Sequence, residues 1–207
     1  MTDVQTADTQ AQATPASVLD WLRASNERFA AGVDTTHDWL AQVRATAGGQ
    51  YPLAAFVGCI DSRVPPEVVF DLGIGDVFAA RTAGNVVDDD VLGSLEFASK
   101  VAGVKAIVVL GHSACGAVKG ACDGVELGHL TGLLAKITPA VAEASGGDTA
   151  PGSGDPALVQ RVVEVNVANV VNTIIDRSAV IAELVDAGEL AVVGAVYDLG
   201  TGRITWM

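Results

Sequence analysis

Two stretches of the chain decide the fold: residues 53–63 read LAAFVGCIDSR, and residues 106–115 read AIVVLGHSAC. In each stretch a short apolar run passes directly into a segment that carries Cys, Asp, Arg or His. Apolar runs of this length are typical of strands buried on both faces, and such strands belong to parallel sheets. Open α/β sheets hold their functional residues just beyond the carboxyl ends of these strands. The two polar segments are therefore expected to meet at one edge of a parallel sheet.

The rest of the chain alternates between helical and extended patterns. A Gly-Thr-Gly turn at 200–202 predicts that the last strand runs antiparallel to the strand before it. We predict a flexible segment over 1–15, which is low in hydrophobicity, and then a single α/β domain over 16–207. This domain has a mostly parallel central β-sheet flanked by helices and an antiparallel C-terminal edge strand. Further strands are expected over 77–81, 190–197 and 203–206, and helices over about 17–32, 38–46, 67–72, 88–103, from 113, 126–144 and 156–187, the last with a bend near Asn172 or Arg177.

The composition restricts the class of protein. The 207 residues include 25 acidic and 12 basic side chains, so the formal net charge is −13, which disfavours nucleic acid or an anionic membrane surface as a partner. No run approaches the roughly 20 apolar residues that cross a bilayer, and the first 15 residues lack the apolar centre of a secretory signal. Cys59, Cys115 and Cys122 are an odd set without close pairing, which fits metal ligation or a reducing compartment better than a disulfide framework. We expect a cytoplasmic protein.

The polar segments contain a candidate metal site. Cys59, His112 and Cys115 supply two thiols and one imidazole, a set of soft ligands that suits zinc. Structural zinc sites close with four protein ligands, whereas catalytic sites usually have three and leave one position for water or substrate. A zinc ion with three protein ligands lowers the pKa of its water to about 7 and so makes hydroxide available near neutral pH. We predict one catalytic Zn²⁺ per chain, held by these three residues.

Asp61 and Arg63 follow the first ligand at spacings of two. If the extended backbone continues past Cys59, the side chains of Cys59, Asp61 and Arg63 face the same way. Pairing with Arg63 would keep the Asp61 carboxylate ionised, with a depressed pKa. We therefore predict that Asp61 accepts a hydrogen bond from the water on zinc, and that Arg63 prevents Asp61 from taking the fourth metal position.

Other interpretations of these motifs are weaker. Cys122 could complete a four-ligand structural site, but Asp61 and Arg63 would then have no role beside the metal. Three residues separate Cys59 from Arg63, which is too short for the phosphate loop of a Cys-dependent phosphatase. The glycines at 73–75 lack the third glycine of a dinucleotide-binding fingerprint.

The paired motifs resemble those of the β-class carbonic anhydrases, with a glutamine at position 50 that favours the plant-like subgroup. The resemblance rests on Cys-Ile-Asp-Ser-Arg at 59–63 together with His-Ser-Ala-Cys-Gly at 112–116. It extends from Asn-Glu-Arg-Phe at 26–29 through Arg-Thr-Ala-Gly-Asn at 81–85 to Val-Tyr at 196–197. It implies a zinc site formed by two cysteines and one histidine, an Asp–Arg dyad at 61 and 63, and a dimer or tetramer in which the N-terminal helices pack on a partner subunit.

The resemblance also implies an activity and a substrate pocket. The expected reaction is the reversible hydration of CO₂ to bicarbonate and a proton, by attack of zinc-bound hydroxide. Gln50 matches a residue that hydrogen-bonds substrate, and Phe78, Ala83 and Phe97 match the pocket wall, although the family often has Tyr at the position of Phe97. Two alternatives stay open at this stage: hydrolysis of CS₂ or COS on the same scaffold, and a zinc-stabilised binding protein without turnover.

Overall fold

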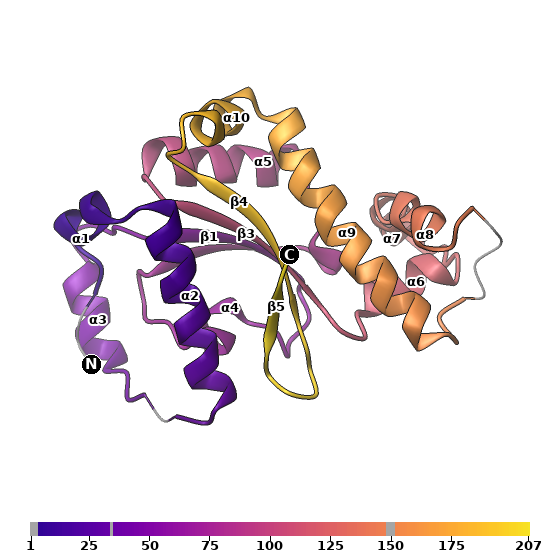
Figure 1. The fold of residues 1–207 in the computed structure, drawn as a ribbon, viewed down its shortest axis with the longest axis horizontal. Helices are drawn as coiled ribbons and strands as arrows, with labels where there is room; N and C mark the ends of the chain where they lie inside the picture. Colours follow the sequence, from indigo (N-terminus) through magenta and orange to yellow (C-terminus); the bar gives the residue numbers. More distant parts are fainter. Residues whose placement is uncertain (1–3, 34, 148–151) are drawn as a thin grey trace.

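A five-stranded sheet forms the centre of the molecule (Figure 1). The structure is a computed structural model that describes residues 4–33, 35–147 and 152–207. The strands follow the order β2-β1-β3-β4-β5; β1 to β4 are parallel, and β5 pairs antiparallel with β4. The predicted fold class is therefore confirmed. The strands are β1 (Ala54–Gly58), β2 (Val77–Arg81), β3 (Ala106–His112), β4 (Ala191–Tyr197) and β5 (Ile204–Trp206).

The two stretches that decide the fold are the central strands β1 and β3. Every residue of both strands is buried, as expected for strands covered on both faces. They are parallel neighbours, and Gly58 lies opposite Leu110 in the register. Because of this register, Cys59 and His112 leave the same edge of the sheet side by side.

Helices cover both faces of the sheet (Figure 1). Side chains at alternate positions of β1 and β3 form two separate apolar clusters, one on each face. One face packs against α5 (Asp89–Glu96), the π-helical turn η2 (Phe97–Val101), α6 (Gly116–Cys122), α7 (Gly128–Leu134), α8 (Thr138–Ala144), α9 (Pro156–Arg177) and α10 (Ala179–Asp186). The other face packs against α2 (Pro15–Ala30) and α4 (Pro66–Val69).

Helix α9 approaches the sheet closely at two glycines. A Cβ atom on Gly111 would lie 2.6 Å from Cγ2 of Val167, and one on Gly194 would lie 2.7 Å from Cγ1 of the same valine. The absence of side chains there lets α9 lie directly over β3 and β4. The predicted bend in the long C-terminal helix is a break at Ser178, whose side chain caps α10 by accepting a hydrogen bond from the Ile181 N–H.

The N-terminal segment, for which we predicted flexibility, contains a short helix. Residues 1–3 lie outside the described residues, but Ala7–Gln12 form the helix α1, which begins with a capping box between Thr6 and Thr9. The Gln10 amide then donates hydrogen bonds to the carbonyl oxygens of Pro52 (2.7 Å) and Ala102 (2.9 Å). Local capping and two long-range hydrogen bonds, rather than apolar burial, hold this helix in place.

Helix α2 buries its apolar stripe on the sheet of its own chain, with Val18 and Leu22 almost fully buried. The segment after α2 is anchored by Asp71, in the loop between α4 and β2. The Asp71 carboxylate accepts hydrogen bonds from Arg28, Thr35 and His37. Burial acts to raise the pKa of Asp71, but these three hydrogen bonds outweigh it and hold the pKa below its ordinary value.

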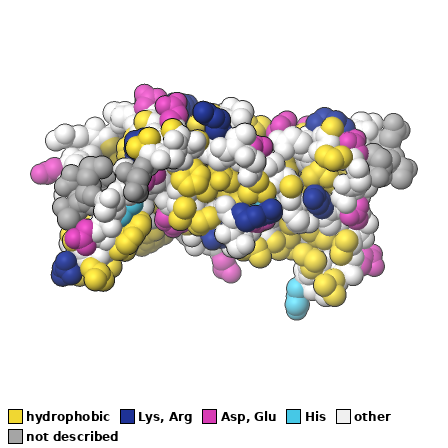
Figure 2. Space-filling view, turned by 90° about the horizontal axis from the view of Figure 1, so that it is seen from below, with side chains coloured by type: hydrophobic (Ala, Val, Ile, Leu, Met, Phe, Trp, Pro, Cys, Tyr) yellow, Lys and Arg dark blue, Asp and Glu magenta, His cyan; other side chains and the backbone are white. Residues whose placement is uncertain are grey.

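Several large apolar side chains are exposed to solvent on the surface. Helix α3 (Trp39–Thr46), capped by Asp38, leaves Trp39, Leu40 and Val43 about half exposed or more. Figure 2 shows one face of the molecule, on which apolar side chains gather in a broad band with a few basic side chains among them. Within the described part of the chain, no helix has both the length and the apolar character needed to span a membrane.

Candidate metal centre

Cys59 follows β1 directly, and its side chain is almost fully buried. Its sulfur accepts hydrogen bonds from two backbone N–H groups, those of Gly84 (3.3 Å) and Asp61 (3.4 Å). Gly84 lies in the short 3-10 turn η1 (Ala83–Asn85), which follows β2. Two donors aimed at one sulfur favour the thiolate, the form that binds metal.

His112 is the last residue of β3, and its side chain is completely buried. Its Nδ1 atom lies 3.0 Å from the carbonyl oxygen of Ser113. A carbonyl only accepts hydrogen bonds, so Nδ1 carries the ring proton and Nε2 presents a lone pair. Nε2 is buried and has no hydrogen-bond partner among the described residues. A buried acceptor of this kind calls for a partner that is not part of the protein.

Cys115 lies at the start of α6, after Ala114 turns the chain in a left-handed conformation (φ 55°). Its sulfur lies 3.9 Å from that of Cys59, and both thiols are buried. The hydrogen bond from Cys115 lowers the pKa of Cys59, although burial opposes it, and the same bond, together with burial, raises the pKa of Cys115. The two sulfurs thus share one proton, which stays on Cys115. A divalent cation would stabilise both thiolates and so remove the need for this shared proton.

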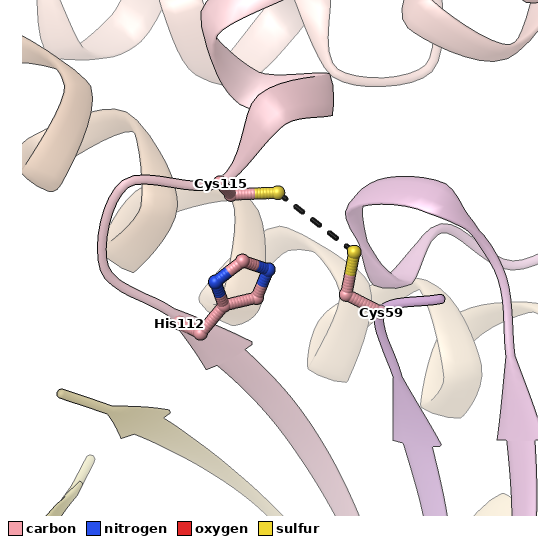
Figure 3. A group of neighbouring side chains, drawn as sticks. All are labelled: Cys59, His112 and Cys115. Carbon is pink, nitrogen blue, oxygen red and sulfur yellow. Dashed lines mark hydrogen bonds between the residues drawn. The ribbon is translucent and has the colours of Figure 1, made fainter. Parts of the chain in front are cut away.

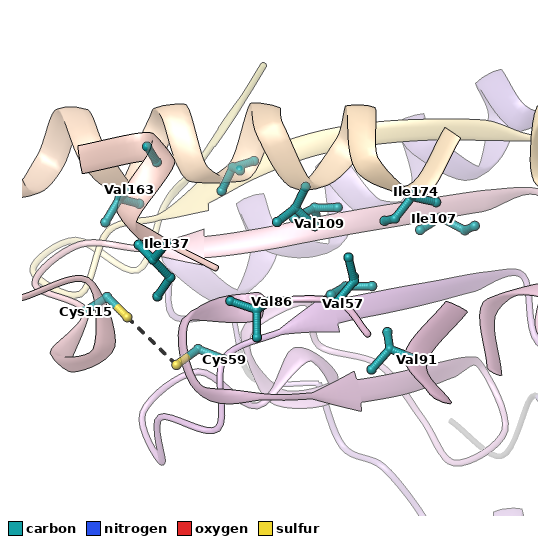
Figure 4. Close-up of a cluster of buried hydrophobic side chains, with 14 of the residues drawn as sticks. Val57, Cys59, Val86, Val91, Ile107, Val109, Cys115, Ile137, Val163 and Ile174 are labelled. Carbon is teal, nitrogen blue, oxygen red and sulfur yellow. Dashed lines mark hydrogen bonds between the residues drawn. The ribbon is translucent and has the colours of Figure 1, made fainter. Parts of the chain in front are cut away.

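The three residues fit a zinc ion. Their ligand atoms all lie within 4.8 Å of one another, and Figure 3 shows the side chains facing a common point from the ends of β1 and β3 and the start of α6. Two sulfurs in a tetrahedral zinc site with Zn–S bonds of about 2.3 Å are about 3.8 Å apart, which matches the observed separation of 3.9 Å. Figure 4 shows that Cys59 and Cys115 adjoin the apolar core, so little water surrounds the ligands.

Asp61 and Arg63 form the predicted pair beside these ligands. The Arg63 guanidinium donates two hydrogen bonds to the Asp61 carboxylate, Nε to Oδ1 at 2.9 Å and Nη2 to Oδ2 at 2.7 Å. These bonds hold the pKa of Asp61 well below its ordinary range. Oδ2 also lies 3.8 Å from Nε2 of His112. A permanently ionised carboxylate thus lies next to the ligand group while Arg63 restrains it.

The backbone around this pair differs from the sequence prediction in one respect. The extended conformation does not continue to Arg63, because the chain turns at 62–63. The Arg63 N–H donates to Oδ1 of Asp61 (3.0 Å), which closes an Asx turn. The two side chains therefore share one side of the chain through a turn and not through strand periodicity.

Comparison with known proteins agrees with the interpretation of these residues as a zinc site. A sequence model of the family described as "Carbonic anhydrase" matches residues 54–204, which include all three ligands and the pair. The chain belongs to the β-carbonic anhydrase family. Members of this family are zinc-dependent lyases, and the Cys59–His112–Cys115 group is the candidate zinc site of this chain.

Three relatives illustrate the similarity. Carbonic anhydrase 2 of Mycobacterium tuberculosis is 40% identical over 198 residues, which cover 91% of each chain. A β-carbonic anhydrase of Aspergillus fumigatus has a similar structure, with a TM-score of 0.72, 29% identity and coverage of 93% of this chain and 89% of that chain. A tetrameric β-carbonic anhydrase of Sordaria macrospora also gives a TM-score of 0.72, at 30% identity and with coverage of 92% and 96%.

The structure brings together some of the predicted pocket residues. Phe78 of β2 and Phe97 of η2 line one cavity of about 530 Å³, with their rings in edge-to-face contact at a centroid distance of 6.2 Å. Ala83 begins the η1 turn that donates to the Cys59 sulfur. The residues that line this cavity do not include Ala83 or any of the three ligand candidates, and Phe78 lies opposite Ala55, four residues before Cys59.

Gln50 is not brought to the metal ligands of its own chain. It lies before β1, in a depression that it shares with Ile74 and Gly75, whereas Cys59 lies after β1. The five residues of β1 alone span about 16 Å. A glutamine side chain cannot bridge that length, so Gln50 could serve only the metal site of another subunit.

Cys122 is not a fourth ligand. It is buried in the apolar core, and among the described residues the group that could hold a metal contains only Cys59, His112 and Cys115. Two supporting residues were not assigned a role from the sequence. Asn166 of α9 donates to the Gly84 carbonyl (3.0 Å), and Arg81 donates to the backbone around Cys59. The role of Asn166 could have been inferred only from its position as an isolated polar residue on the buried side of α9.

Proposed function

We propose that this protein catalyses the reversible hydration of CO₂ to bicarbonate and a proton, with one Zn²⁺ per chain. The observation that carries the proposal is the number and arrangement of ligands: among the described residues, three buried donors and no fourth lie together, with the Asp61–Arg63 pair beside them. Zinc at such a site supplies, when bound, a Lewis acid that lowers the pKa of water to about 7 and so provides a nucleophile near neutral pH.

The chain's own residues orient the reactants. Because the pKa of Asp61 is far below neutral, its carboxylate acts at working pH as a hydrogen-bond acceptor only. It can hold the O–H of a water molecule and direct the oxygen lone pair towards carbon. Arg63 occupies both carboxylate oxygens from the outer side, so Asp61 does not turn towards the ligands. We propose that buffer carries away the released proton.

We propose an apolar pocket for a small uncharged substrate. Phe78, Ala83 and Phe97 would form an apolar wall, and the wall at Phe97 has no hydroxyl group. We propose that Gln50 of a second subunit donates a hydrogen bond to a substrate oxygen, since it cannot reach the site of its own chain. The active unit is then a homodimer or a larger homo-oligomer, in which the exposed apolar side chains of α3 provide contact area.

We also propose that the protein acts in the cytoplasm. All three cysteines are free thiols in the structure, and two of them are zinc ligands, which a reducing compartment preserves.

Stopped-flow measurement of CO₂ hydration tests the function directly. The zinc-loaded protein is expected to turn over CO₂, and Asp61→Ala is expected to lower kcat by about 10²-fold or more while zinc stays bound. Arg161→Ala on the exposed side of α9 is the control. Full zinc content without CO₂ turnover would contradict the proposal and favour a binding protein, and turnover of CS₂ or COS alone would change the substrate class.

A further inference from the structure

Arg81 makes contacts that the proposed mechanism does not use. It is the last residue of β2, opposite Gly58 in the register, and it is half-buried. Its Nε donates to the carbonyl oxygen of Cys59 at 2.8 Å, and its Nη2 donates to that of Asp61 at 2.6 Å. None of the ion pairs among the described residues includes Arg81. The guanidinium therefore binds the backbone of the turn that carries the proposed zinc ligand Cys59 and the carboxylate of Asp61.

The two hydrogen bonds act where the regular ladder of the sheet ends. Beyond Gly58, the turn is tied to the continuation of β2 by a backbone bond from Ile60 N–H to the Thr82 carbonyl (3.3 Å) and by the bond from Gly84 N–H to the Cys59 sulfur (3.3 Å). The bonds from Arg81 are shorter and charge-assisted, and such bonds are about twice as strong as neutral ones. Among the described residues, the Cys59 carbonyl has no other donor. Removing the guanidinium would leave that carbonyl without its partner and loosen the peptide units at 59–61.

The position of Asp61 makes this restraint consequential. Its Oδ2 lies only 3.8 Å from Nε2 of His112, so a small rotation of the turn would bring the carboxylate among the metal ligands. Arg63 is mostly exposed and restrains the carboxylate from the solvent side. Arg81 restrains the backbone of the same residue from the side of the sheet. The two arginines hold different parts of Asp61.

We propose that Arg81 is a positioning residue: it fixes the backbone of Cys59 and Asp61 so that the Asp61 carboxylate stays paired with Arg63 and outside the metal's fourth position. The predicted effect of Arg81 on turnover rests on the proposed function, whereas its predicted effect on metal coordination does not. Arg81 acts through Asp61, so the effect of removing it should depend on whether the carboxylate is present.

The test compares Arg81→Met with Arg81→Lys, which keeps the charge but offers one donor centre in place of the fork. Arg161→Met, on the exposed side of α9, is the matched control for the loss of a positive charge. Each protein is loaded with Co²⁺ in place of zinc, and its absorption spectrum reports the coordination. Zinc release to a chelator and urea unfolding are measured in parallel.

We expect the Co²⁺ spectrum of Arg81→Met to differ from that of the parent, and the double variant Arg81→Met/Asp61→Ala to give the spectrum of Asp61→Ala alone. Arg81→Met should lower kcat for CO₂ hydration by about tenfold or more, yet by no more than about twofold in the Asp61→Ala background. Arg81→Lys should lie in between. Unchanged spectra and kinetics in Arg81→Met would overturn the inference, as would equal losses in both backgrounds. If none of the proteins hydrates CO₂, the proposed function fails, while the spectra still decide the role of Arg81.

Discussion

Replacing Gly84 by alanine should destabilise the metal centre through backbone strain and overpacking. Gly84 has a left-handed conformation (φ 67°), and its N–H donates to the Cys59 sulfur. A Cβ atom there would lie 2.5 Å from Cδ1 of Ile137 and 3.2 Å from Cβ of Ala117. Ile137 is completely buried and Ala117 belongs to α6, which packs on the core, so the added methyl group has no free space.

The expected cost follows from these contacts. A left-handed conformation costs a residue other than glycine roughly 1–2 kcal/mol, and overpacking a filled core costs roughly 1–3 kcal/mol more. The free energy of unfolding of Gly84→Ala should therefore be about 2–5 kcal/mol lower than that of the parent. Because the turn must shift to relieve the contact with Ile137, its N–H moves off the Cys59 sulfur and zinc release should become faster.

Urea unfolding of the zinc-loaded protein and zinc transfer to a chelator measure these effects. Gly132→Ala in α7 is the matched control, since a Cβ there has no neighbour within 4 Å, and it should leave stability unchanged or raise it by up to about 1 kcal/mol. Ile137→Val removes the methyl group that collides, so it should recover part of the loss in the Gly84→Ala background. The reasoning is refuted if Gly84→Ala is as stable as Gly132→Ala, or if Ile137→Val makes Gly84→Ala less stable.

Two further predictions concern the N-terminal half of the chain. Asp71→Ala removes the acceptor of three hydrogen bonds and should lower the free energy of unfolding by about 2–4 kcal/mol. Folding lowers the pKa of Asp71, so its contribution to the free energy of unfolding is complete above the unfolded pKa of about 3.9 and is lost as the pH falls below it. In urea unfolding, the difference in free energy between the parent and Asp71→Ala should therefore narrow between about pH 5 and pH 3. A difference that stays constant over this range would contradict the assignment. If Gln50 serves the partner's metal site, a doubly tagged heterodimer of one Gln50→Ala chain and one Asp61→Ala chain keeps one complete site and should show about half of the parent's CO₂ hydration rate per dimer. A heterodimer no more active than the Asp61→Ala homodimer would show that Gln50 acts within its own chain.

The sequence was informative where local pattern and topology agree. Cys59 and His112 follow or end apolar runs that are typical of buried strands, and parallel neighbours bring their carboxyl ends together. Three ligands and the pair at 61 and 63 could therefore be placed before any geometry was known. The identity of the metal was predicted from the ligand types, since two thiols and an imidazole favour zinc.

The remaining features depend on contacts between distant parts of the chain. Helix α1 has no apolar stripe and is held by the hydrogen bonds of Gln10 to residues 42 and 92 positions away. Gln50 stands nine positions before Cys59 in the sequence, and only the length of β1 shows that the two lie at opposite ends of the sheet. The bonds from Arg81 to two carbonyl oxygens depend on the register of β2, which no periodicity predicts.

The central claim is a zinc ion with three protein ligands and one position open to solvent. A crystal structure of the zinc-loaded protein, grown at a pH where it hydrates CO₂ and measured with anomalous scattering at the zinc edge, tests this claim most directly. We predict one zinc per chain, bonded to Sγ of Cys59, Nε2 of His112 and Sγ of Cys115, with a water molecule as the fourth ligand. A fourth ligand supplied by a side chain, such as the carboxylate of Asp61, in the active protein would contradict the account.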